Sequence, residues 1–137
     1  MSESSAQREA DAQAAAMYAA DAASRALGIV ISDVAPGRAT ATMLVTDAML
    51  NGHGICHGGY VFLLADTAFA FACNTHGGRV VAAGADVAFL SPVQSGDELV
   101  AVAAERALRG RSGIYDVTVR AGDVVVAEFR GRSRATA

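Results

Sequence analysis

The sequence predicts an α+β domain in which helices cover one face of an antiparallel sheet. Residues 7–28 are rich in alanine, contain no proline and end at Gly28, which is typical of a helix. Residues 60–73 form a second run that is too apolar for a surface helix. Most other segments alternate apolar and polar residues with a period of two, which indicates strands. Because four of these strands follow one another without an intervening helix, the sheet is expected to be antiparallel.

Six strands are expected, and glycine, proline or aspartate marks most of their ends. They lie at residues 28–37, 38–46, 77–92 and 95–110, and in a hairpin over residues 111–132 with its turn at residues 121–123. Pro36-Gly37 supplies the turn between the first two strands. The alanines of residues 95–110 are also compatible with a helix.

Length and composition indicate one domain that folds without disulfides or metals. The chain has 137 residues, of which 53% are hydrophobic and 18% charged. We expect a single domain over residues 1–137, with residues 1–27 as an N-terminal helical extension. A net charge of −3 and the lack of a long basic run argue against a nucleic acid or a membrane surface as the partner.

The cysteines and the longest apolar run bear on location. Cys56 and Cys73 follow an N-terminus without a signal-peptide pattern, so we expect free thiols and a cytoplasmic protein. Residues 60–73 are too short to span a membrane and contain Asp66 near their centre.

A helix as apolar as residues 60–73 must be covered on nearly all sides. Since one six-stranded sheet covers only part of it, we also expect a partner subunit.

Several motifs in and after this helix resemble one known family. They are NGHGICHGG, LADTAFAFACN, FLSP, SGDEL, GIYDV and FRGRS. Over about residues 24–134 the chain resembles the hotdog-fold acyl-CoA thioesterases, specifically the phenylacetyl-CoA thioesterase (PaaI-type) family. The resemblance implies a sheet wrapped around the central helix, paired subunits, and hydrolysis of an acyl-CoA substrate without a cofactor. The resemblance does not fix the acyl group. We expect a small aromatic acyl group, a role in phenylacetate catabolism, and a homotetramer built as a dimer of dimers.

Asp66 and Gly58 are the first candidates for catalysis. Hydrolysis of a thioester needs donors for the developing oxyanion, and backbone N–H groups at a helix N-terminus supply them. Gly58 allows the backbone to come close enough. The reaction also needs a nucleophile or a base, and an apolar helix raises the basicity of a carboxylate such as Asp66. The structural alternative is that a neighbour such as Thr67 satisfies this carboxylate.

Further site residues follow from the resemblance. Asn51 is expected to position the water or the carbonyl, and His57 to hold the loop over the thioester, although the two residues could equally be a turn former and a helix cap. Substrate contacts are expected from Gly59, Thr67, Ser91, Pro92 and Arg111, with arginines suited to the phosphates of CoA. At Ala82 and Ala83 the chain departs from related thioesterases that place a water-holding serine or threonine there.

Other readings of the same residues are weaker. His53, Cys56 and His57 lack a second cluster to complete a metal site, so no metal is expected. Cys56 has no evident relay to make it a nucleophile. A dehydratase or hydratase of the same fold would need a histidine paired with the helix acid, in loops that this chain lacks. A non-catalytic acyl-CoA-binding protein is the remaining alternative.

Helix geometry predicts that each active site is shared between two chains. Gly58 and Asp66 are eight residues apart, which is about 12 Å along a helix axis. Both groups must reach within roughly 3 Å of one reacting carbonyl, and one Asp side chain cannot close that gap. Two antiparallel helices that face each other across a two-fold axis would place Gly58 of each beside Asp66 of the other.

Overall fold

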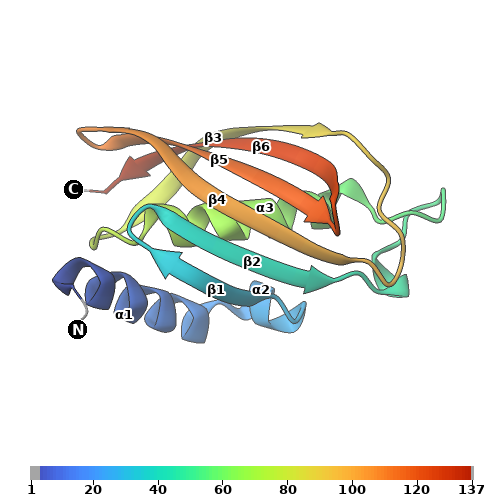
Figure 1. The fold of residues 1–137 in the computed structure, drawn as a ribbon, viewed down its shortest axis with the longest axis horizontal. Coiled ribbons are helices and arrows are strands. Elements are labelled where there is room, and N and C mark those ends of the chain that lie inside the picture. Colours follow the sequence, from blue (N-terminus) through green and yellow to red (C-terminus); the bar gives the residue numbers. More distant parts are fainter. Residues whose placement is uncertain (1–3, 137) are drawn as a thin grey trace.

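The structure, a computed structural model, describes residues 4–136 (Figure 1). Its helices are α1 (Ser5–Ala20), α2 (Ala22–Ala26) and α3 (Gly58–Cys73), with a 3₁₀ turn η1 (Asp47–Met49). Its strands are β1 (Val30–Ala35), β2 (Arg38–Leu44), β3 (Val80–Phe89), β4 (Glu98–Arg109), β5 (Ser112–Ala121) and β6 (Val124–Ala135). The predicted α+β class and six strands are confirmed.

One sheet contains all six strands and curves around α3 (Figure 1). The strand order is β1-β2-β4-β5-β6-β3, and every neighbouring pair is antiparallel. Residues 98–109 form a strand and not a helix, because β4 is paired with β5 along its length and with β2 over residues 98–104. Pairing on both sides outweighs the helical preference of its alanines.

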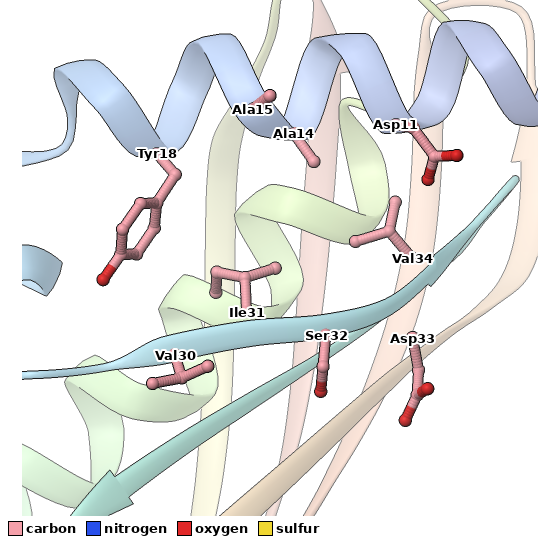
Figure 2. Close-up of a pocket in the computed structure, with 9 residues that line it drawn as sticks. All are labelled: Asp11, Ala14, Ala15, Tyr18, Val30, Ile31, Ser32, Asp33 and Val34. Carbon is pink, nitrogen blue, oxygen red and sulfur yellow. The ribbon is translucent and has the colours of Figure 1, made fainter.

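The N-terminal helix is shorter than predicted, because the chain breaks at Asp21. The Asp21 carboxylate accepts the backbone N–H of Ser24 at 2.9 Å and so begins a new helix, α2. Figure 2 shows Tyr18 and Ala14 of α1 pointing toward β1, with Ile31 and Val34 pointing back. The Tyr18 hydroxyl also donates to the Ile29 carbonyl at 2.6 Å. In this way α1 covers part of the open edge of β1.

The core lies between α3 and the concave face of the sheet. The Phe69 ring of α3 is fully buried and packs against Tyr115 and Phe129, at centroid distances of 5.7 and 5.8 Å. It lies directly over Gly131 of β6, where a Cβ atom would come within 2.8 Å of the ring. The glycine therefore sets how closely α3 approaches the sheet.

One side of α3 remains uncovered within the chain. Its residues that are not fully buried include Gly59, Leu63, Asp66 and Ala70, whose spacing of four, three and four places them on one stripe. Strand β3, at the edge of the sheet, is exposed too: Val81 is 40% and Phe89 is 55% exposed. A largely apolar helix stripe and an open strand edge are thus left without cover from residues 4–136.

Candidate active site

The loop before α3 is built around Asn51. The Asn51 Oδ1 atom accepts the backbone N–H groups of His53 at 2.9 Å and Ile55 at 3.3 Å. The Asn51 backbone N–H donates to the Ile55 carbonyl. Asn51 therefore does form a turn, as the structural alternative required. Its Nδ2 group has no acceptor within residues 4–136, and Asn51 lines the groove described below.

His57 is the N-cap of α3. Its Nδ1 atom accepts the backbone N–H of Gly59 at 2.9 Å, which leaves Nε2 as the protonated nitrogen of the neutral ring. The N–H of Gly59 is therefore already bound. The N–H of Gly58, by contrast, has no acceptor in the described part of the chain, so it is free to donate to a ligand at the N-terminus of α3.

A groove of about 520 Å³ opens at this helix end. Most of its lining is apolar, and the polar side chains are the amide of Asn51 and the hydroxyl of Ser91. The lining residues are Asn51, Ile55, Cys56, Gly58, Val61, Phe89, Leu90, Ser91, Pro92, Val93 and Val126. The size and the apolar character suit a small organic group. Four of the predicted residues meet here, namely Asn51, Gly58, Ser91 and Pro92.

Asp66 lies two turns farther along α3, outside this groove. Burial raises the pKa of its carboxyl above the ordinary value for aspartate, because desolvation disfavours the charged form. Within residues 4–136 the carboxylate accepts no hydrogen bond and forms no ion pair. Thr67 does not satisfy it, since the Thr67 and Ser24 hydroxyls are hydrogen-bonded to each other at 3.2 Å in the interior. The structural alternative for Asp66 therefore finds no support among the described residues.

The other predicted contacts lie away from the groove. Thr67 is turned into the core toward Ser24. Gly59 is on the uncovered stripe of α3, and Ala82 and Ala83 are exposed on β3 without a hydroxyl to offer. Arg111 is exposed in the turn between β4 and β5, at the opposite end of the molecule from the loop that precedes α3 (Figure 1).

Beside Arg111 a second hollow, of about 370 Å³, is rimmed by arginines. Arg109 and Arg134 flank Ser112 in adjacent strands, and the Arg134 guanidinium donates to the Ser112 hydroxyl at 3.2 Å. Arg132, also on the rim, is bound to Asp86 at 2.9 Å. Ala83, Ala107 and Ile114 contribute an apolar lining. The hollow can hold an anion beside an apolar group.

Other features of the described chain add no further candidate for the active site. The hollow between α1 and β1, of about 430 Å³, contains none of the predicted site residues (Figure 2). Both cysteines are free and buried, and burial raises the pKa of Cys73 to about 12. No helix within residues 4–136 combines the length and the apolar character needed to cross a membrane.

Sequence reasoning missed part of the groove. It did not assign Ile55, Val61, Val93 or Val126, since an apolar side chain that lines a site gives the same sequence signal as one that only packs in the core. Phe89 belongs to the FLSP motif quoted above, directly before the predicted contacts Ser91 and Pro92. The motif was a usable signal for that residue.

Comparison with known proteins shows which family and which solved structures this chain resembles. Residues 53–128 match the thioesterase superfamily. The acyl-coenzyme A thioesterase PaaI of Escherichia coli (strain K12) is 49% identical over 119 residues, which are 86% of this chain and 85% of that protein. The solved structure of the E. coli PaaI protein from the phenylacetic acid degradation operon has a TM-score of 0.94 and 45% identity, and 97% of each chain is covered.

A more distant relative is smu.793 from Streptococcus mutans UA159, solved bound to acetyl CoA. It is 25% identical with a TM-score of 0.75, over 79% of this chain and 88% of that one. Together the matches confirm the predicted hotdog fold and the predicted family. The chain belongs to the thioesterase superfamily.

Proposed function

We propose that this protein hydrolyses acyl-CoA thioesters of small aromatic acids, such as phenylacetyl-CoA or hydroxyphenylacetyl-CoA, to the free acid and CoA. The observation that carries the proposal is the Asp66 carboxylate, which is half-buried, unpartnered within the described residues, and held on the same helix as the open N–H of Gly58. The thioesterase PaaI of E. coli, 49% identical, supports the acyl-CoA substrate, and its operon supports the aromatic acid.

In this proposal the thioester carbonyl lies at the N-terminus of α3. Its oxygen accepts the N–H of Gly58, and the partial positive charge of the helix end stabilises the oxyanion as it develops. His57 keeps the first turn in place through its bond to Gly59. The Asn51 Nδ2 group is available to bind the carbonyl or a water molecule from the side of the loop.

Asp66 then acts either as the nucleophile or as the base that activates water. Two routes are open to the carboxylate: direct attack on the carbonyl carbon with later hydrolysis of the anhydride, or removal of a proton from an attacking water molecule. Both routes end with CoA thiolate as the leaving group and the free acid as the product. The apolar surroundings that raise the pKa of Asp66 make the carboxylate a stronger base in either role.

We propose that the two groups come from different subunits. Gly58 and Asp66 lie on one unbroken helix, so about 12 Å of axial rise separates them within a chain. The uncovered stripe of α3 and the open edge of β3 offer a surface to a second copy, and its helix would bring Asp66 to the Gly58 end of the first. The expected assembly is a dimer with two shared sites, and two dimers then form a tetramer.

The arginines suit the nucleotide end of CoA. Arg109, Arg111 and Arg134 lie together at the β4–β5 turn, and none of them forms an ion pair within the described chain. Guanidinium groups bind phosphates with two parallel hydrogen bonds. Arg130 differs, because its guanidinium is already bound to Asp116 at 2.7 Å.

We also propose that the reaction takes place in the cytoplasm. Two free, buried cysteines support this proposal, because free thiols are typical of a reducing compartment.

The test is hydrolysis by the purified protein, followed as free CoA with a thiol reagent. The panel contains phenylacetyl-, hydroxyphenylacetyl-, benzoyl- and medium-chain acyl-CoA. We expect the aromatic thioesters to be hydrolysed, and Asp66→Asn to lower kcat by at least about a hundredfold while the protein still folds and binds CoA. Asp123→Asn, in the exposed β5–β6 turn, is the matched control and should keep full activity. Full activity in Asp66→Asn, or binding without CoA release by the unmodified protein, would refute the proposal.

A further inference from the structure

The Phe89 side chain packs directly on the first residue of α3. A Cβ atom at Gly58 would lie 3.0 Å from Cζ of the Phe89 ring, and 3.2 and 3.4 Å from Cε1 and Cε2. The ring thus rests against the α-carbon of Gly58. It adjoins the backbone whose N–H is free for an oxyanion, so it would lie beside the acyl carbon of a thioester bound as proposed above.

The position of Phe89 is fixed by the sheet. Phe89 is the last residue of β3 and pairs with Ala127 of β6, and the next residue, Leu90, donates its N–H to the Val126 carbonyl at 2.8 Å. The backbone under the ring is therefore held by β6, on the one side of β3 that is paired. Gly58 supplies the close contact on one side of the ring.

Much of the Phe89 side chain has no such cover within residues 4–136. Phe89 is 55% exposed, although it lines an otherwise apolar groove, and it is the one aromatic residue among the lining residues described above. Aromatic rings pair with one another in offset or edge-to-face arrangements and gain free energy beyond simple burial. An aromatic acyl group bound with its carbonyl at Gly58 would lie within reach of this ring.

We infer that Phe89 is the specificity-determining residue of the groove, and that its ring selects aromatic over aliphatic acyl groups by direct ring contact. This inference rests on the proposed thioesterase function and deepens it, since it assigns the choice of acyl group to one side chain. The inference requires that the ring acts on the acyl group, not on the reacting atoms. Removing the ring should then change the preference between thioesters more than the turnover of any one of them.

The experiment compares phenylacetyl-CoA with hexanoyl-CoA in each variant. In Phe89→Leu we expect the ratio of the two kcat/KM values to fall about two- to tenfold, mainly through KM for phenylacetyl-CoA. Phe89→Tyr keeps the ring and should keep the ratio. Val81→Ala, on the same exposed strand but outside the groove, is the control for a general effect on the edge of the sheet. Because both thioesters are assayed with one preparation, a loss of folded protein cancels in the ratio.

A second measurement separates this inference from the proposed function. Isothermal titration with the non-hydrolysable thioethers S-(2-phenylethyl)-CoA and S-hexyl-CoA gives the same comparison without turnover. Unchanged ratios in Phe89→Leu, with hydrolysis intact, would overturn the inference and leave the function standing. An equal loss of kcat for both thioesters would assign Phe89 to positioning Gly58 and would also overturn it. A third outcome is that the protein hydrolyses neither thioester, while Phe89→Leu still lowers the affinity for the phenylethyl thioether relative to the hexyl thioether. That outcome would overturn the proposed function and leave the role of Phe89 standing.

Discussion

The environment of each carboxylate in this protein determines its proton affinity, and two aspartates show opposite outcomes. Asp66 is surrounded by apolar helix residues without a donor in the described chain, and desolvation raises its pKa. Asp116 lies on the polar face of the sheet, where hydrogen bonds from Arg130, and then from Arg106, hold its pKa below the usual value. A base for hydrolysis must be unpaired and readily protonated, and only the first environment provides this.

The pH dependence of hydrolysis should report the raised pKa of Asp66. The ionised carboxylate is the active form, so the rate falls as the pH drops through its pKa. Because that pKa lies above the usual value of about 4, the acid limb should lie at a higher pH than for an ordinary aspartate. The measurement is kcat for phenylacetyl-CoA between pH 4 and 8, with circular dichroism at each pH as the control for unfolding. A kcat that is constant from pH 4 to 7 would contradict the role of Asp66.

At the scale of elements, the position of α3 depends on a glycine in the strand beneath it. Phe69 reaches the sheet only because Gly131 has no side chain, and Tyr115 and Phe129 flank the ring. The helix carries both Gly58 and Asp66, so the depth at which α3 packs also sets where these two groups lie. A residue of β6 with no chemistry of its own thus helps to position the site.

Gly131→Ala should therefore destabilise the fold. The new methyl group would lie 2.8 Å from three atoms of the Phe69 ring, which its neighbours prevent from moving aside. Overpacking of this kind costs about 1–3 kcal/mol, to be measured as the free energy of unfolding in urea. Gly52→Ala is the matched control, because no atom lies within 4 Å of its added methyl group and the backbone is not left-handed. Equal stability of the two variants would show that α3 can shift without loss.

At the scale of the whole molecule, the exposed apolar surfaces lie next to the residues of the proposed active site. The stripe of α3 that the sheet does not cover includes Asp66, and the open edge of the sheet is β3, which ends at Phe89. A second copy placed on these surfaces would bury apolar residues such as Leu63 and Val81 and enclose the carboxylate. Stability of the assembly and completion of the site would then have the same cause.

Subunit mixing tests the shared site. Asp66→Asn subunits and subunits changed at Gly58, for example Gly58→Val, should each be inactive alone. A mixture should regain activity, because each heterodimer contains one site with neither substitution and one site with both. Equal mixing at full exchange gives half heterodimers with one working site of two, so about one quarter of the normal activity is expected. Confirmed subunit exchange without any return of activity would show that each site lies within one chain.

Much of this protein could be predicted from local sequence pattern. The period-two alternation placed all six strands, and the glycines at positions 37 and 122 marked turns that need a positive φ, observed as 75° and 59°. The apolar run with one carboxylate predicted both the central helix and its candidate catalytic residue. These features depend on neighbours in the chain, so the sequence contains them directly. Even the break at Asp21 has a local cause, a capping side chain within an alanine-rich helix, although propensity alone did not predict it.

Only the tertiary structure decided which residues from distant parts of the sequence come into contact. Strand β3 follows α3 in the chain but pairs with β6 at the far edge, and this pairing delivers Phe89 to Gly58. Long-range pairing also aligns Arg134 of β6 with Ser112 of β5, and long-range packing turns Thr67 toward Ser24 instead of toward a substrate. Periodicity shows which face of an element is apolar but not which element covers it. That choice is made when all the apolar faces are buried together, and the contacts around the groove are its consequence.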